Sequence, residues 1–130
     1  MDGFIFLFRG GLLHEVDDVS PEEMQQHMDK WQAWIADMTR KEIFLGGEPL
    51  HVEGGRVVTR GGVVSDGPFP EAKEMVAGYV AIRVDTMEEA CEVAKGCPIY
   101  DYDGRVEVHK ILAEHSDAVD EAVAQELAAS

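Results

Sequence analysis

Histidine is the residue of this sequence best suited to acid–base chemistry, because its side chain gains or loses a proton near neutral pH. The five histidines stand at positions 14, 27, 51, 109 and 115, with no pair four residues apart on a predicted helix and no cluster with cysteine. Metal sites usually need such spacing, so we expect no bound metal. There is also no Gly-x-Ser-x-Gly elbow for a serine nucleophile and no phosphate-binding glycine loop.

His27 lies in a predicted helix that begins at the capping sequence Ser20-Pro21-Glu22-Glu23 and ends near Lys41. Five apolar residues repeat at helical spacing and predict one stripe that faces a sheet: Met24, Met28, Trp31, Ile35 and Met38. His27 falls on the edge of that stripe, where a side chain can be half-buried. It could act as a general acid or base, or it could be a hydrogen-bonded histidine at a helix–loop contact.

Acidic and basic residues also gather in a loop that cannot be regular structure. The segment Asp66-Gly67-Pro68-Phe69-Pro70 contains two prolines, which have no backbone donor for a strand ladder. Asp66 could fix this turn by accepting backbone N–H groups. Glu71, Lys73 and Glu74 follow, and they could line the mouth of a pocket or form a solvated charge pair.

The elements that must position these residues alternate between strand and helix patterns. We predict strands at Gly3–Arg9, at Ile43–Leu45 before a kink or bulge at Gly46-Gly47, at Arg56–Arg60 and Val63–Ser65 around a two-residue Gly61-Gly62 turn, at Met75–Val84 and at Arg105–Ile111. We predict further helices from Thr86 to Lys95 and from Ser116 or Asp117 to Ala128. This order predicts an α+β fold of the split βαβ type, an antiparallel sheet with two helices on one face.

The first strand is apolar on both faces, which predicts a sheet that is covered on both sides. Four polar or amphipathic side chains alternate with the valines of the later strands and therefore lie on the face away from the helices: Tyr79, Arg83, Glu107 and His109. They could form a hydrogen-bond network at an interface between two copies of the chain, or part of a ligand site.

The composition indicates which kinds of partner the protein can bind and in which compartment of the cell we expect it. The 130 residues include 26 acidic and 11 basic side chains, a formal net charge of −15, which repels nucleic acid and anionic membrane surfaces. No apolar run approaches the roughly 20 residues of a membrane-spanning helix. Cys91 and Cys97 are too far apart along a helical pattern to form a disulfide, so we expect both to be reduced and buried. We therefore expect a cytoplasmic protein.

Four segments together resemble the YCII-related, or DGPF-domain, family. The main one is Ser65-Asp66-Gly67-Pro68-Phe69-Pro70-Glu71-Ala72-Lys73-Glu74, followed by Gly78-Tyr79. The others are Ser20–Met24 with His27, then Gly46-Gly47-Glu48-Pro49-Leu50, then Glu89-Ala90 through Cys97-Pro98 to Val106-Glu107-Val108. The resemblance covers about residues 1–112, and residues 113–130 form an additional C-terminal helical extension.

The resemblance implies a ferredoxin-like fold that pairs into a homodimeric α/β barrel, with a His–Asp pair in a small pocket. Here that pair would be His27 and Asp66, as catalytic residues for proton transfer of the isomerase or lyase kind, with no cofactor. His109 stands where the family commonly has an arginine. The predicted substrate-binding residues are Trp31, Phe69, Glu71, Lys73, Tyr79, Arg83 and His109.

Two alternatives to an enzyme stay open at this point. The same pocket could belong to a non-catalytic module that binds or senses a small molecule. The chain could also be an interaction subunit whose C-terminal helix docks a partner through Val119, Val123 and Leu127.

Overall fold

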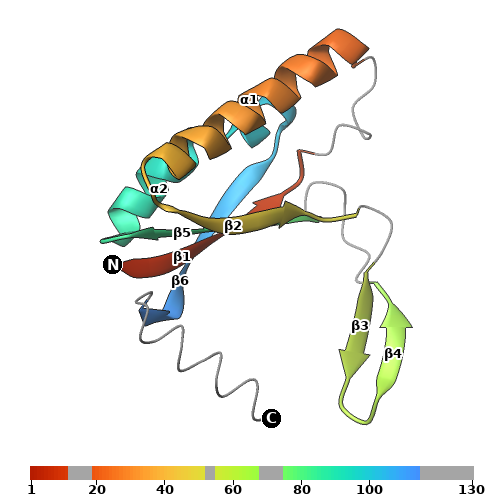
Figure 1. Cartoon of the computed structure of the whole chain (residues 1–130). Coiled ribbons are helices and arrows are strands. Elements are labelled where there is room, and N and C mark those ends of the chain that lie inside the picture. The colour runs from red at the N-terminus through yellow and green to blue at the C-terminus, as the bar shows by residue number, and fades with distance from the viewer. Residues whose placement is uncertain (12–18, 52–54, 68–74, 115–130) are drawn as a thin grey trace.

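The structure is a computed structural model in which residues 1–11, 19–51, 55–67 and 75–114 are described (Figure 1). Its elements, in chain order, are β1 (Asp2–Arg9), α1 (Pro21–Arg40), β2 (Phe44–Pro49), β3 (Arg56–Thr59), β4 (Val63–Asp66), β5 (Val76–Val84), α2 (Met87–Lys95), the 3-10 helix η3 (Pro98–Tyr102) and β6 (Arg105–Glu114). In its C-terminal region the structure describes residues only as far as 114. The predicted C-terminal helix and its docking residues, Val119, Val123 and Leu127, therefore lie outside the described residues. The predicted domain boundary at residue 112 falls at the end of the described part, so it stays a prediction.

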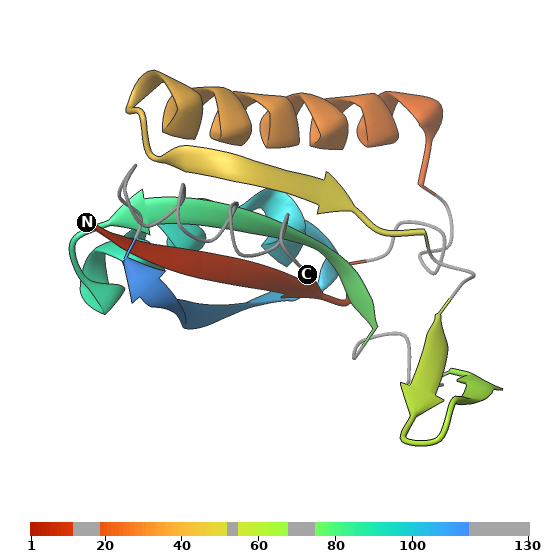
Figure 2. The ribbon, with the colours of Figure 1, turned by 60° about the horizontal axis from the view of Figure 1, so that its bottom comes forward.

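The main sheet has four strands in the order β2-β5-β1-β6, and every neighbouring pair is antiparallel. Both helices lie on one face of this sheet (Figure 1). This is the ferredoxin-like α+β arrangement that the order of elements predicted. A separate two-stranded sheet, β3-β4, is inserted between β2 and β5 and projects away from the main sheet (Figures 1 and 2).

The central strand β1 contributes three phenylalanines to the hydrophobic core. Phe4, Phe6 and Phe8 point toward the helices and are almost fully buried, and the ring of Phe6 stacks on Trp34 of α1. Truncating a buried phenylalanine of this kind costs about 3–5 kcal/mol of stability, because both burial and packing are lost. Ile5 and Leu7 alternate with these residues and are half-buried on the opposite face, as expected for a strand that is apolar on both sides.

Helix α1 begins as predicted but turns a different face to the sheet. The Ser20 hydroxyl accepts a hydrogen bond from the Glu23 amide at 3.1 Å, which is the expected N-cap. The buried residues, however, are His27, Trp34 and Met38, while Met24 and Met28 are 43% and 45% exposed. The prediction of a stripe that includes both methionines was therefore wrong at its N-terminal end. Trp34 packs on Phe6 and Phe8 and marks the buried face, and His27 lies on that same face.

Helix α2 and the turn after it fix the C-terminal half against α1. The Thr86 hydroxyl caps α2 by accepting from the Glu89 amide at 3.1 Å. The indole N–H of Trp34 donates to the Val93 carbonyl at 3.1 Å and so ties the two helices together. Ala90 and Ala94 are buried, whereas Met87 is 37% exposed. Both cysteines are free; Cys97 is buried, whereas Cys91 is only half-buried.

Two glycine-rich segments interrupt regular strand structure, one at a bulge in β2 and one at the turn of the β3-β4 hairpin. The pairing of β2 with β5 shifts between Phe44 and Gly46, which is the predicted bulge. In the hairpin, Thr59 pairs with Val63 and the Gly62 amide donates to the Thr59 carbonyl at 3.1 Å, so the turn has three residues and not the predicted two. Positive φ angles of 90° at Gly61 and 79° at Gly62 explain why these two of the three turn residues are glycine.

The last strand, β6, extends to Glu114, beyond its predicted end at Ile111. No helix among the described residues is long and apolar enough to cross a membrane.

Candidate functional site

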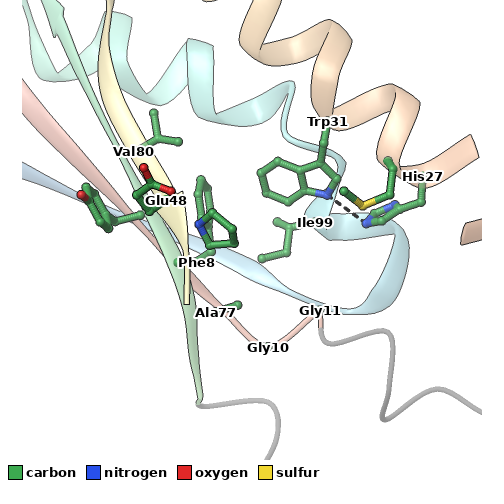
Figure 3. A pocket seen from close by; sticks show the side chains of 14 residues that line it. Phe8, Gly10, Gly11, His27, Trp31, Glu48, Ala77, Val80 and Ile99 are labelled. Carbon is green, nitrogen blue, oxygen red and sulfur yellow. Dashed lines mark hydrogen bonds between the residues drawn. The ribbon is translucent and has the colours of Figure 1, made fainter. Parts of the chain in front are cut away.

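A cavity of about 320 Å³ opens on the helix side of the sheet, between α1, the end of β1, the β2–β5 edge and η3. Figure 3 shows it from close by. Its lining is mostly apolar and consists of Phe8, Gly10, Gly11, His27, Met28, Trp31, Gly47, Glu48, Pro49, Ala77, Gly78, Tyr79, Val80 and Ile99. A cavity of this size and lining is suited to a small, largely apolar molecule.

Glycine keeps one wall of the cavity thin. A Cβ atom on Gly78 would lie 2.8 Å from the Glu48 carbonyl oxygen, and one on Gly47 would lie 2.6 Å from the Tyr79 carbonyl oxygen. Strands β2 and β5 therefore approach each other so closely that neither position has room for a side chain. On the opposite wall, Gly11 has a φ of +65°, and its own Cβ would meet Ile99 at 2.5 Å.

His27 is the buried polar residue of this cavity, with only 5% of its surface exposed. Its Nε2 accepts a hydrogen bond from the indole N–H of Trp31 at 2.9 Å, the dashed line in Figure 3. A nitrogen that accepts carries no proton, so the neutral ring holds its proton on Nδ1. That Nδ1 is buried and has no hydrogen-bond partner. Buried polar atoms without a partner are rare in native proteins and call for an explanation.

Charged residues approach His27 from the side of η3. Asp101 Oδ2 lies 3.8 Å from His27 Nδ1, and Lys30 Nζ lies 2.9 Å from the same oxygen. The ring of Tyr102 meets that of His27 edge-on, with centroids 4.7 Å apart. Burial lowers the pKa of His27 below its usual value; the nearby carboxylate of Asp101 opposes this shift and Lys30 adds to it. The hydrogen bond from Lys30 lowers the pKa of Asp101.

Asp66, the predicted partner of His27, lies elsewhere in the structure. It is the last residue of β4, its side chain is 70% exposed, and its carboxylate pairs with Arg56 at 3.0 Å. It does not line the cavity. The carboxylate that the structure places beside His27 is that of Asp101.

Apart from His109, the other predicted site residues divide into three groups. Trp31 lines the cavity with His27. Tyr79 belongs to the β5 wall of the cavity, but it pairs with Leu7 and its side chain shares the sheet face away from the helices. Arg83 instead donates to the Glu42 carbonyl at 3.1 Å and braces the turn between α1 and β2. Phe69, Glu71 and Lys73 lie outside the described residues.

His109 belongs to a network on the other face of the sheet. Its Nε2 lies 2.9 Å from Glu107 Oε1, and Arg9 Nε donates to Glu107 Oε2 at 2.9 Å. These two partners lower the pKa of Glu107. The side chains predicted to share this face are thus partly hydrogen-bonded to one another.

Several residues of the site were not singled out from the sequence. Glu48 and Pro49 stand in the segment that resembles the family pattern, but their spacing gave no hint of a role. Lys30 lies on α1 outside the apolar repeat, where a charged residue is ordinary. Asp101 and Tyr102 had no signal at all, because η3 is too short to show a periodic pattern. Among the residues that the structure describes, no group of three or more His, Cys, Asp or Glu side chains could hold a metal ion.

Comparisons with known proteins bear on the family and the fold. No curated protein matches this sequence. Among solved structures, the chain is similar to 5-chloro-2-hydroxyhydroquinone dehydrochlorinase from Burkholderia phenoliruptrix in complex with 2,5-dihydroxybenzoquinone, with 14% identity, a TM-score of 0.44 and coverage of 89% of this chain and 97% of that one. The sequence model of the YCII-related domain matches residues 12–115. This match spans most of the 130 residues, and the chain belongs to the YCII-related family.

Proposed function

We propose that this protein is an enzyme that binds a small, largely apolar molecule in the cavity beside α1 and that His27 transfers a proton to or from it. The observation that carries the proposal is the buried His27 ring at the cavity wall, with one nitrogen held by Trp31 and the other without a hydrogen-bond partner. A purely structural histidine would normally have both nitrogens satisfied.

The environment of His27 favours a general base over a general acid. Burial lowers its pKa, so the ring is neutral at pH 7 and its accepting nitrogen can take a proton. The apolar walls of Phe8, Trp31 and Val80 would exclude water from a bound molecule. A carbon or oxygen acid without charge of its own fits best, because the lining is mostly apolar and the chain carries a formal charge of −15.

A second function, binding without catalysis, is favoured by one specific observation. His27 Nε2 accepts the Trp31 N–H and Nδ1 is inaccessible to solvent, so neither ring nitrogen is open to a molecule in the cavity. A binding or regulatory module could use the same cavity without moving Trp31.

Deuterium incorporation into cyclohexanone tests proton transfer directly. The probe is a small apolar ring with weakly acidic C–H bonds, incubated with the protein in D₂O and followed by NMR. Wild type is expected to exchange the α protons at least about 100-fold faster than His27→Gln, the usual contribution of a positioned acid or base. The matched control is His51→Gln, which removes an exposed histidine that does not line the cavity.

The same samples separate the two functions. Chemical-shift changes at Trp31 and Val80 without deuterium incorporation would favour the non-catalytic module. Equal exchange rates in wild type and in His27→Gln would overturn the acid–base role of His27.

A further inference from the structure

Met28 stands where the cavity meets solvent. It lines the cavity together with His27 and Trp31, yet 45% of its surface is exposed. Other apolar residues of the lining are almost closed to water, since Phe8 and Ile99 are only 4% and 2% exposed. A residue that touches an apolar cavity and is also open to water lies at the mouth of that cavity.

A thioether at the mouth can be oxidised. An exposed methionine is within reach of a dissolved peroxide, whereas a buried one is shielded by its neighbours. The sulfoxide that forms is polar, so it packs less favourably against an apolar molecule than the thioether does. Met28 therefore combines access for an oxidant with a place on the surface that a bound molecule would contact.

We propose that Met28 is a modification site: hydrogen peroxide converts it to the sulfoxide, and the sulfoxide weakens the binding of small apolar molecules in the cavity. This inference rests on one half of the proposed function, the binding of such a molecule, and not on proton transfer by His27. It adds a means by which an oxidant lowers the occupancy of the site.

The oxidation is the transfer of one oxygen atom. A lone pair of the Met28 sulfur attacks one peroxide oxygen, the O–O bond breaks and an S–O bond forms. The other peroxide oxygen leaves as hydroxide and takes up the proton that the transferred oxygen loses, so it becomes water. The sulfur loses two electrons and the peroxide gains them, and no further reactant is needed.

Two other methionines of α1 provide matched comparisons. Met24 is one helical turn before Met28 and is 43% exposed, but it does not line the cavity. Met38 lies on the same helix and is only 1% exposed. We therefore expect oxidation of Met24 to have no effect on the cavity, and Met38 to resist oxidation.

Cysteine thiols also react with peroxide. Cys97 is buried, and burial raises its pKa to about 12, so it stays a protonated and poorly reactive thiol. Cys91 is half-buried on α2 and does not line the cavity. Cys91→Ser removes the more accessible of these two thiols, and it should leave the response of the cavity to peroxide unchanged.

The test uses the whole chain, hydrogen peroxide as the oxidant and cyclohexanone as the probe of the cavity. Peptide mass spectrometry should find Met24 and Met28 oxidised at least about tenfold faster than Met38. The NMR signals of Val80, which lines the cavity, report binding of the probe. After treatment with peroxide, the dissociation constant of cyclohexanone should rise about fivefold or more, because a polar group has entered the apolar mouth.

Substitutions separate the two exposed methionines. Met28→Leu keeps an apolar side chain but removes the sulfur, so its dissociation constant should be the same before and after peroxide. Met24→Leu should keep the full response of wild type. Met28→Gln places a polar group at the mouth without any oxidant and should weaken binding as the sulfoxide does, whereas Met24→Gln should not.

Three results would overturn the inference. The first is oxidation of Met28 no faster than that of Met38. The second is an equal loss of binding after peroxide in wild type and in Met28→Leu. The third is untreated wild type that does not bind cyclohexanone.

Deuterium exchange into cyclohexanone separates this inference from the proposed function. If the probe binds and binding falls on oxidation of Met28, but no deuterium is incorporated, the inference stands and the proposed enzyme fails. If wild type exchanges the α protons through His27, and complete oxidation of Met28 changes neither binding nor exchange, the proposed function stands and the inference fails.

Discussion

At the scale of single residues, the hydrogen bond between Trp31 and His27 decides how the imidazole titrates. A proton on Nε2 would face the indole N–H at 2.9 Å, two donors with no acceptor between them. This contact acts in the same direction as burial, and both disfavour the charged ring. Because His27 and Trp31 are one helical turn apart on α1, the helix itself holds the indole N–H against Nε2 and so favours the neutral ring.

The lowered pKa predicts a dependence of stability on pH. An unfolded chain protonates His27 near pH 6.5, whereas the folded chain does so at lower pH, so the unfolded state binds more protons in between. The contribution of His27 to stability is complete above about pH 6.5 and declines as the pH falls toward the folded pKa. Urea unfolding at pH 7.5 and 5.5 should show a larger loss for wild type than for His27→Gln. Equal losses would contradict the prediction.

The contact with Trp31 can be tested on its own. Trp31→Phe keeps an aromatic ring beside Phe8 but removes the donor to Nε2, so the His27 pKa should rise. The buried Nε2 also loses its partner, which costs about 1–3 kcal/mol of stability. Trp34→Phe is the matched control, because it removes an indole N–H that is bonded to the Val93 carbonyl. An NMR titration in which both variants shift His27 equally would refute the role of Trp31.

At the scale of elements, the close approach of β2 and β5 shapes the cavity. Gly78→Ala would place a Cβ atom 2.8 Å from the Glu48 carbonyl oxygen and 3.1 Å from Pro49 Cα. We expect it to push β2 outward, to cost about 1–3 kcal/mol in urea unfolding and to weaken binding of any probe in the cavity. Gly96→Ala is the control, since its Cβ would meet Trp34 at an ordinary 3.4 Å. Equal stability of the two variants would contradict this account.

Periodicity in the sequence predicted these elements well where it was strong. The alternation of Val80 and Ile82 with Tyr79 and Arg83 fixed the faces of β5 correctly. The 4-3-4-3 repeat of α1 predicted a helix but not its buried face. Met24 and Met28 fit the repeat as well as Trp31 does, whereas Trp34 lies outside it. The packing of Trp34 on Phe6 and Phe8 places the buried face of the helix.

The site was less predictable than the fold. His27 and Trp31 were found because they lie on a helix with a clear pattern. Asp101 was missed because its approach to His27 depends on where α2 ends and η3 begins. Asp101 follows its other partner, Lys30, by 71 residues in the chain. No local pattern encodes a contact over such a separation. Asp66 was singled out for its unusual loop, and in the structure it forms an exposed ion pair with Arg56.

At the scale of the whole molecule, we expect two copies to pair through the sheet face away from the helices. Ile5 and Leu7 are half-buried there beside Tyr79 and Glu107. Leu7→Lys should therefore convert a dimer to a monomer in sedimentation velocity at micromolar concentration, without loss of helical circular dichroism. Val64→Lys, on the exposed hairpin, should leave the dimer intact. A wild-type species of 14.3 kDa would rule out the pairing.

The strand order also determines when the main sheet can form during synthesis on the ribosome. Strand β1 is made first, yet its partners are β5 and β6, so Asp2 pairs with Val84 and with Glu114. At about 5–20 residues per second, roughly 4–15 s pass between the translation of β1 and that of β5. During this interval Phe4, Phe6 and Phe8 have no sheet to join. The nascent chain thus carries an aromatic strand suited to transient capture by a chaperone, and the sheet can close only late in translation.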